Sequence, residues 1–275
     1  SNPIGLSTPA DTLLLRDIEN AHFKLLNDIT VPTGAGINSY STIPFASTLD
    51  GGGYTLTTHT PLFNRIVGSR DNTVPVNGGP DSADNLERGY IYNLKVLINA
   101  DFNNGVFGNL VGGTLKNVSA SAAPSVKLKI DGPSHNQRGA FLNNIYGYSY
   151  LYGCFTDIKV DITDTTVGNI AGLIGYIDSP KATVESCGSN SDVYATTART
   201  GVASLIGNIS FDSQNVLIKN CFAAGLVQRG GYIAIGTKNK KDRVQNLYWS
   251  IKDENTANQA TVLPMNPATT DSADS

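Results

Sequence analysis

The hydrophobic positions of this chain come in short groups separated by turn-forming residues. After residue 25, runs rich in Val, Ile, Leu, Tyr and Phe are bounded by Gly, Asn, Asp or Ser, and no segment shows a sustained helical period. In residues 157–162, Ile158, Val160 and Ile162 alternate with charged residues. This pattern predicts short strands that have one apolar face and one polar face.

One phrase of the sequence repeats with a nearly fixed period. Cys154, Cys187 and Cys221 lie 33 and 34 residues apart, and a valine lies six positions after each of them. The aligned column reads Leu94, Val118, Cys154, Cys187, Cys221 and Leu247. A position that accepts Leu, Val and Cys is a buried apolar position, since free cysteine behaves as a small hydrophobic residue. We therefore predict a ladder of free, buried thiols rather than disulfide bonds.

Repeats of about 20–50 residues mark solenoids and propellers. A β-propeller is the main rival architecture, but its blades hold four strands in about 40–45 residues, whereas most periods here are closer to 30 residues. A second recurring phrase has a small residue, a large apolar residue, Gly or Asn, a polar residue and a large apolar residue. It occurs at residues 105–110, 171–177 and 203–209. We interpret each period as one turn of a parallel β-helix, in which equivalent residues stack.

The two ends of the chain differ from its middle. Residues 1–21 are predicted to form an N-terminal cap with a short helix within 7–21, in which Ser7 or Thr8 is the N-cap and Pro9 the first helical residue. Such a helix would cover the open end of the stacked strands. Residues 22–251 are assigned to the β-helix with a polar insertion at 69–88, and residues 252–275 to a polar tail or linker.

Composition narrows the classes of function. The net charge of −3 offers no basic surface for nucleic acid, and only 16% of the residues are charged. No apolar run is long enough to span a membrane. Residues 1–30 show no signal-peptide pattern because acidic residues and Arg16 interrupt the apolar stretch. We therefore expect neither a nucleic-acid partner nor membrane insertion.

The repeated phrases resemble the GLUG-motif repeats of bacterial surface and secreted proteins. Gly172–Gly175 matches Gly-Leu-(large apolar)-Gly outright, and residues 204–207 and 105–108 are close to it. Further similarity lies in residues 22–29, 45–56 and 246–249. The resemblance covers about residues 20–250 and departs from the pattern at 69–88.

This resemblance implies a right-handed parallel β-helix within a large exported bacterial protein. The repeats occur in adhesins and in the non-catalytic N-terminal part of IgA-protease-type metallopeptidases. No universal catalytic residue exists in the family, so none is carried over to this chain.

No constellation of catalytic residues stands out. The three histidines form no spaced pair and no His-Glu-x-x-His motif, so we expect no metal site and no cofactor. Glycoside hydrolysis needs two carboxylates about 5–9.5 Å apart. Asp157, Asp161 and Asp164 form the best cluster, with Asp157 and Asp161 expected on one face of a strand. An ordinary polar outer face is the preferred interpretation.

Two features suggest binding instead. The insertion at 69–88 carries Arg70, Asp71, Asp81 and Asp84, and long loops on a rigid scaffold often hold function. The alternative is a disordered insertion.

The second feature is a row of tyrosines at every other position. It consists of Tyr146, Tyr148, Tyr150 and Tyr152. On one extended strand all four would face the same way, and exposed rings would stack on sugars or on an apolar partner. A buried aromatic layer, or a bend at Gly147 and Gly153, is the preferred alternative.

From these features we predict a non-enzymatic, extracellular binding or spacer module of a bacterial surface or secreted protein. Its expected partners are a host glycan or protein receptor and the remainder of a larger surface protein. Two alternatives stay open. One is a polysaccharide lyase or glycoside hydrolase on the same fold, and the other is a trimeric module similar to a phage tail spike.

Overall fold

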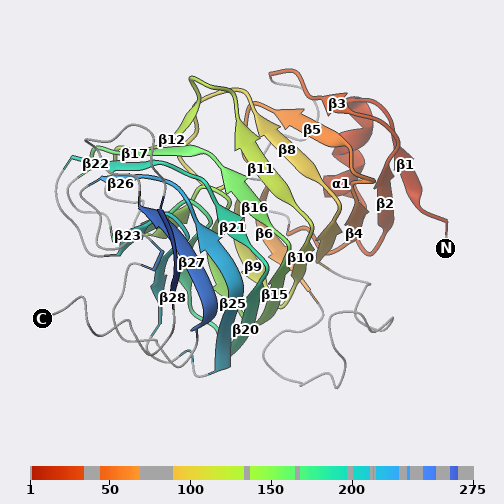
Figure 1. The fold of residues 1–275 in the computed structure, drawn as a ribbon. Helices are drawn as coiled ribbons and strands as arrows, with labels where there is room; N and C mark the ends of the chain where they lie inside the picture. The colour runs from red at the N-terminus through yellow and green to blue at the C-terminus, as the bar shows by residue number, and fades with distance from the viewer. Residues whose placement is uncertain are drawn as a thin grey trace, which may run out of the picture.

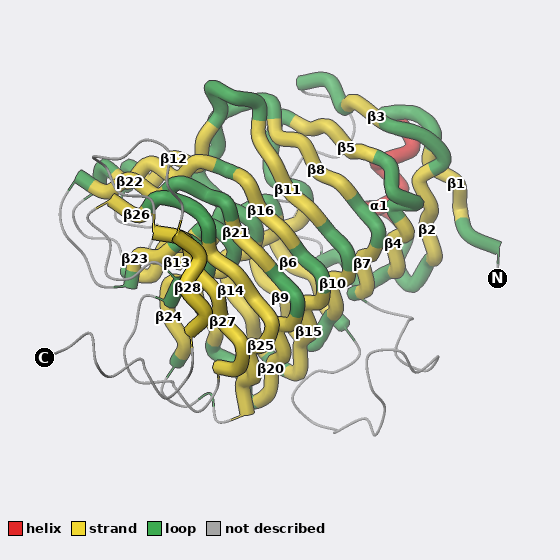
Figure 2. Tube along the Cα trace, in the orientation of Figure 1, coloured by secondary structure: helices red, strands yellow, loops and turns green. Residues whose placement is uncertain are grey.

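A computed structural model gives the fold of the chain (Figure 1). It describes residues 2–33, 44–68, 89–132, 137–164, 168–196, 201–210, 213, 215–228, 234–235, 244–251 and 261–265. Within these residues almost all regular structure is β-strand, and nearly every strand pair is parallel (Figure 2). The prediction of an all-β fold of parallel strands with very little helix is confirmed.

The largest sheet has two arms that meet at a corner. One arm contains β1 (Ile4–Leu6), β2 (His22–Leu25), β4 (Thr48–Asp50), β7 (Tyr90–Tyr92), β10 (Thr114–Lys116), β15 (Tyr148–Tyr152) and β20 (Lys181–Glu185). The other contains β3 (Ile29–Thr30), β5 (Thr55–Thr58), β8 (Lys95–Ile98), β11 (Ser119–Ala122), β16 (Phe155–Asp157) and β21 (Gly188–Ser189). The long strand β25 (Asn215–Ala223) joins the arms, because it pairs with both β20 and β21. Beyond it, β27 (Val244–Ile251) pairs with β25, and β28 (Thr261–Met265) adds antiparallel to β27.

Three smaller sheets complete the cross-section. The first contains β6 (Phe63–Val67), β9 (Phe107–Val111), β14 (Leu142–Tyr146), β19 (Ile174–Ile177) and β24 (Ile206–Ile209). The second contains β12 (Lys127–Ile130), β17 (Lys159–Ile162), β22 (Val193–Ala195) and β26 (Val227–Gln228), and the third β13 (Gln137–Gly139), β18 (Asn169–Ala171) and β23 (Val202–Ala203). Between β14 and β19 the chain passes through β15, β16, β17 and β18 in turn, so each such pass visits every sheet.

The register of the strands follows the repeat of the sequence. Leu115 pairs with Leu151, Leu151 with Val184, and Val184 with Ile218. Residues one position after each cysteine also pair, and Cys221 itself pairs with Leu247. Equivalent residues of successive passes therefore lie side by side, as the cysteine spacing predicts.

From β7 onwards, the corner between the two arms is made by one residue per pass in the left-handed backbone region. These residues, called the corner row below, are Asn93, Asn117, Gly153, Ser186, Asn220 and Asn246, with φ between 52° and 62°. Only Gly adopts this conformation freely, and Asn tolerates it better than most other residues. The choice of Asn at four of the six positions therefore follows from the backbone that the bend requires.

The second glycine of the GLUG-like phrase lies where two backbones meet. A Cβ on Gly175 would lie 2.5 Å from the carbonyl carbon of Arg138 in β13. A Cβ on Gly207 would lie 2.8 Å from the backbone nitrogen of Ile170 in β18. No larger side chain fits between these strands unless a backbone shifts.

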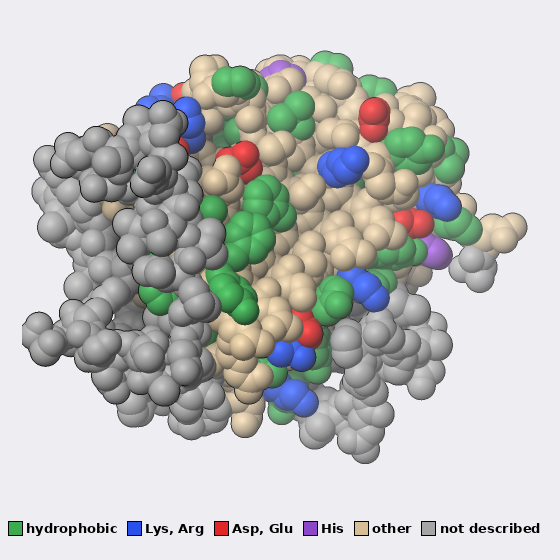
Figure 3. Space-filling view, in the orientation of Figure 1, with side chains coloured by type: hydrophobic (Ala, Val, Ile, Leu, Met, Phe, Trp, Pro, Cys, Tyr) green, Lys and Arg blue, Asp and Glu red, His purple; other side chains and the backbone are tan. Residues whose placement is uncertain are grey.

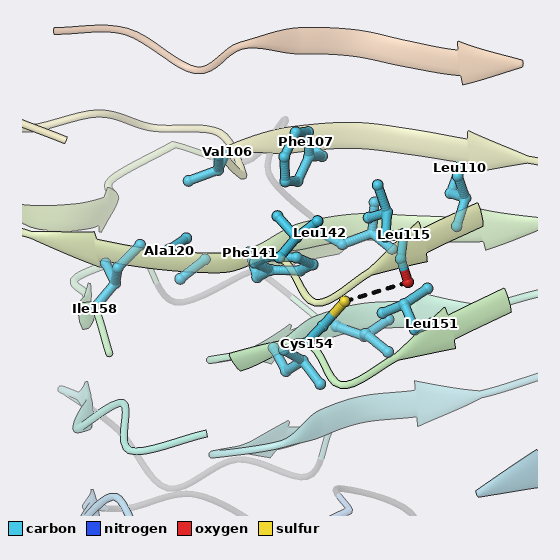
Figure 4. Packing of buried hydrophobic residues seen from close by; sticks show 14 of the residues in the cluster. Val106, Phe107, Leu110, Leu115, Ala120, Phe141, Leu142, Leu151, Cys154 and Ile158 are labelled. Atoms are coloured by element: carbon cyan, nitrogen blue, oxygen red, sulfur yellow. Dashed lines mark hydrogen bonds between the residues drawn. The ribbon is translucent and has the colours of Figure 1, made fainter. Parts of the chain in front are cut away.

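The core is a continuous apolar cluster enclosed by the sheets (Figure 4). Phe107, Phe141 and Leu151 are fully buried in it. Cys154, Cys187 and Cys221 are free and buried in the same cluster, as predicted. Figure 4 shows the Cys154 Sγ directed at the Leu115 carbonyl oxygen, 3.4 Å away.

Burial and hydrogen bonding also set the ionisation of Cys187 and Cys221. Burial raises the pKa of Cys187 well above its ordinary value. The pKa of Cys221 is also raised, mainly by a hydrogen bond with Cys187 and to a lesser extent by burial. Because the thiolate is the reactive form, these cysteines are poor nucleophiles and poor metal ligands in the folded chain.

The N-terminal segment contains the predicted helix in a shorter form. It consists of the 3-10 helix η1 (Ala10–Leu13) and the single α-helical turn α1 (Leu14–Asp17), with Pro9 at the N-cap rather than inside the helix. The Asp11 carboxylate accepts hydrogen bonds from the backbone N–H groups of Ser7 and Thr8, both at 2.8 Å, and these hydrogen bonds lower its pKa. The strand β1, which precedes this helix and pairs with β2, was not foreseen in the sequence.

In the part of the chain that the structure describes, no helix is long and apolar enough to cross a membrane.

Gly175→Ala tests the close approach of the two backbones. We expect a loss of about 2 kcal/mol or more in the free energy of unfolding, since the atoms to be displaced belong to the backbone. Urea denaturation measures it. The matched control is Gly53→Ala, because Gly53 has φ +81° but open space around it, so only about 1 kcal/mol of backbone strain is expected. Equal costs for the two variants would contradict the packing described here.

Cys187→Val tests the structural interpretation of the cysteine ladder. At neutral pH we expect the fold to persist, with a change under about 1.5 kcal/mol in the free energy of unfolding. The raised pKa of Cys187 keeps its thiol protonated in the folded chain. In the unfolded chain the same thiol ionises once the pH exceeds its ordinary pKa of 9.0. Above that pH the native chain therefore loses stability relative to the variant by up to about 1.4 kcal/mol per pH unit. Urea titrations at neutral and alkaline pH measure the difference, and parallel curves for the two proteins would refute the prediction.

Candidate binding surface

Large exposed hydrophobic side chains gather along the corner of the largest sheet. In the described part of the chain they are Ile18, Leu26, Tyr54, Tyr152, Phe222 and Tyr248. All except Ile18 lie within two positions of the bend between the arms, and the four aromatic residues are each about 40% exposed. Figure 3 shows hydrophobic side chains gathered over β16, β21 and β25 on this face. Below, the corner row and these four aromatic residues are called the corner surface.

A column of outward-facing residues runs next to the corner row. Ser119 pairs with Phe155, Phe155 with Gly188, and Gly188 with Phe222. The column continues to Tyr248, which pairs with Phe222. The rings of Phe155 and Phe222 stack with centroids 5.9 Å apart across the strand that carries Gly188.

Gly188 gives the Phe222 ring its position. A Cβ on Gly188 would lie 2.2 Å from the Phe222 Cε1 and 2.3 Å from its Cζ. The ring therefore occupies the space that any other side chain would fill at this position. Because its exposed fraction is nevertheless 41%, the ring rests on the strand and presents surface to solvent.

The predicted row of four tyrosines is a row of three. Tyr146 ends β14 and pairs with Val111 in a different sheet, because Gly147 turns the chain with φ +63°. Burial, and then the nearby Asp178 carboxylate, raises the pKa of Tyr146. Of the preferred alternative, the bend at Gly147 is therefore confirmed.

The other three tyrosines share the outer face of β15. Ser149 and Leu151 between them are buried, Tyr148 and Tyr150 are half-buried, and Tyr152 is 40% exposed. Only Tyr152 belongs to the corner surface. The Lys116 ammonium lies 5.8 Å from the centroid of its ring, within the range of a cation–π contact.

A polar depression continues the corner surface towards the N-terminus. It has a volume of about 460 Å³ and is lined by Asp50, Gly52, Gly53, Asn93, Lys95, Asn117 and Ser119. These residues come from the bends and strand ends of three successive passes. The depression therefore offers amide, hydroxyl and charged groups beside the aromatic positions.

Charged side chains at the edge of the corner form ion pairs between neighbouring passes. Lys24 Nζ lies 3.8 Å from an Asp50 carboxylate oxygen, and Lys219 Nζ lies 3.0 Å from a Glu185 carboxylate oxygen. In both ion pairs the two residues of opposite charge lie on adjacent strands, which is a favourable cross-strand arrangement.

The acidic cluster proposed from the sequence is divided by the fold. Asp157 ends β16 in the largest sheet, and Asp161 lies on β17 in another sheet, so the expectation that they share one face of a strand is wrong. The backbone turns between them at Ile158. Asp161 forms an ion pair with Lys127, and Asp157 accepts a hydrogen bond from Asn190. The two carboxylates therefore lie on different sheets, and each has a partner of its own.

Among the residues that the structure describes, no group of three or more His, Cys, Asp or Glu side chains is arranged to hold a metal ion. The predicted binding residues Arg70, Asp71, Asp81 and Asp84 lie outside the described residues.

No protein-family model matches the chain, and no curated protein matches its sequence. The fold is similar to the crystal structure of a proposed immunoglobulin A1 protease from Bacteroides ovatus. The TM-score is 0.51 with 14% sequence identity, and the match covers 82% of this chain and 78% of that chain. At this identity the likeness concerns the fold alone.

Sequence reasoning missed Phe222, Tyr248 and the corner row. Phe155, Phe222 and Tyr248 each follow a member of the aligned column, at Cys154, Cys221 and Leu247. Residues at this position alternate to the outside once the column is assigned to the core. That aromatic signal was present in the repeat but is spread over phrases about 30 residues apart.

Proposed function

We propose that this chain is a non-enzymatic, extracellular binding module of a bacterial surface or secreted protein, which adheres to a glycan or protein receptor. The observation that carries the proposal is the corner surface, where the four exposed aromatic residues of the described chain lie along one bend of the largest sheet, in line with a polar depression. Exposed aromatic residues grouped with hydrogen-bonding side chains are typical of recognition sites.

The proposed architecture is a right-handed parallel β-helix. Each complete pass contributes strands to all sheets in the same order, and equivalent residues pair in register. Parallel strands joined by crossovers are right-handed in almost all proteins. A helical stack of this kind gives a long, rigid surface on which equivalent outward positions form rows.

A relation to GLUG-motif proteins, and through them to adhesins or IgA-protease-type peptidases, forms part of the proposal. The close approach of backbones at Gly175 and Gly207 gives a physical reason for the glycine of the phrase. The similar fold of a protein described as a proposed immunoglobulin A1 protease supports the same relation. The sequence holds no His-Glu-x-x-His motif, so the proposal concerns binding and not peptide cleavage.

Single alanine substitutions in the corner surface test the proposal. We expect Phe222→Ala and Tyr248→Ala each to weaken receptor binding by about tenfold or more, because a flat aromatic contact is lost. Glycan arrays and binding to immobilised host extracellular proteins first identify the receptor, and calorimetry then measures the affinity. The matched control is Ile18→Ala, since Ile18 is 37% exposed but lies at the end of α1. Equal affinities for all three variants would refute the corner surface as the site.

A screen for polysaccharide cleavage tests the enzymatic alternative. We expect no release of reducing ends or unsaturated products from plant, algal or host glycans, because Asp161 is engaged by the Lys127 ammonium and Asp157 by the Asn190 amide in a part of the described surface without an evident acid–base pair. Turnover that disappears in Asp161→Asn, with an unchanged melting temperature, would favour a lyase or hydrolase over a binding module.

A further inference from the structure

We propose that the ligand of the corner surface is a neutral, linear polysaccharide that lies along the stacking direction and bridges a break in the corner row. The inference rests on the proposed function and narrows it to one class of ligand and one position on the surface.

The break is visible in the hydrogen bonds between the corner residues. Asn117 Nδ2 donates to Asn93 Oδ1 at 3.3 Å, and Asn246 Nδ2 donates to Asn220 Oδ1 at 3.0 Å. Each amide thus bonds to the amide of the preceding pass. Between these two pairs the row holds Gly153 and Ser186, so the amide ladder is interrupted over two passes.

The interruption leaves hydrogen-bonding groups turned towards solvent. A Cβ on Gly153 would lie 2.5 Å from the Asn117 Oδ1, so this oxygen lies over the glycine, which has no side chain to donate to it. On the other side of the break, Ser186 is exposed and no described residue accepts a hydrogen bond from the Asn220 Nδ2. An acceptor, a hydroxyl and a donor therefore follow one another along the corner.

The backbone at Ser186 is unusual as well. Ser186 has φ 54°, a conformation that is strained for a non-glycine residue and that serine adopts less readily than Asn or Gly. Asn at this position would lower that strain and continue the ladder. A strained residue that is not replaced by the better alternative points to a functional requirement.

Aromatic surface flanks the break on both sides. Tyr152 directly precedes Gly153, and Phe155 lies two positions after it. Phe222 rests on Gly188, two positions after Ser186, with its ring next to that of Phe155. Sugar rings carry C–H groups on their faces and hydroxyls at their edges, so they stack on the electron-rich face of an aromatic ring while their hydroxyls reach the amides.

The charges around the break are of both signs and balance one another, which favours a neutral ligand. Glu185 and Lys219 pair with each other, and Lys116 lies over the Tyr152 ring. Asp157 accepts a hydrogen bond from Asn190. Lys95 lies farther along the corner, in the polar depression and two strands away from β16.

The direction in which the ligand lies follows from the two lines of residues at the corner. The corner row and the column from Ser119 to Tyr248 both run across the strands, and each step between neighbouring strands is about 4.8 Å. Flat rings at intervals along one line, with amides beside them, match repeating sugar units better than one deep pocket for a protein side chain.

Gly153→Asn tests the inference, because it completes the ladder without removing any aromatic residue. Gly153 has φ 62°, which Asn accepts, and the atom to be displaced is the mobile end of Asn117. The probes are hexasaccharides of β-glucan, mannan and xylan, with galacturonate and hyaluronan hexasaccharides as acidic counterparts. We expect the native chain to bind at least one neutral probe, and Gly153→Asn to weaken that binding by about tenfold or more, with an equal or higher melting temperature.

The matched control is Gly201→Asn, which places the same side chain on a left-handed glycine outside the corner surface, directly before β23. The first atom that it meets is again an asparagine side-chain oxygen, the Asn169 Oδ1 at 2.9 Å. We expect its affinity to stay within about twofold of the native value.

The outcomes separate the inference from the proposed function. Loss of neutral-glycan binding in Gly153→Asn but not in Gly201→Asn supports the inference. Glycan binding that Phe222→Ala weakens and Gly153→Asn leaves intact overturns the position at the break while the proposed function stands. Tighter binding of the acidic probes, or binding only to a protein receptor that Phe222→Ala abolishes, overturns the ligand class alone. If neither substitution changes the affinity of any bound ligand, the proposed function fails as well.

Discussion

In-register parallel pairing between successive passes of the chain is the constraint on which this structure depends. A parallel strand satisfies its backbone groups through its two neighbours, so every pass must present the same register to the next. Leu115, Leu151 and Val184 accordingly pair in sequence, and the Tyr150 N–H donates to the Gly113 carbonyl of the preceding pass. Under this constraint each residue type repeats as a column, and each column needs a composition suited to its surroundings.

The bend at the corner shows how strict a column can be. A left-handed backbone between two arms restricts the position to residues that accept positive φ, and the amides of Asn117 and Asn246 add hydrogen bonds along the stack. The inward columns are restricted by volume instead. Cys154, Cys187 and Cys221 occupy a column that also takes leucine and valine. The size and apolar character of the cysteine side chain, rather than its reactivity, therefore suit it to this column.

The sequence predicted the parallel all-β fold because these restrictions recur with the period of the chain. It predicted the surface poorly for the same physical reason, since outward positions carry little restriction and therefore little periodic signal. The alternation of Tyr146 and Tyr148 looked like one strand because the turn between them depends on the single residue Gly147. Phe155 and Phe222 are 67 residues apart in sequence, and only the pairing register brings their rings into contact.

The interior behind the corner surface explains why the aromatic rings can be held in place. The inward column behind them contains Ala120, Thr156, Ser189 and Ala223, all buried and all small. On the opposite side Gly172 comes so close that a Cβ would lie 2.4 Å from the Ser189 Oγ. The part of the largest sheet that carries these rings is therefore backed by a narrow, close-packed interior, in which side chains have little room to move. Little conformational entropy is then lost when a ligand stacks on the rings, because the rings are already ordered. A few aromatic contacts can therefore suffice for recognition.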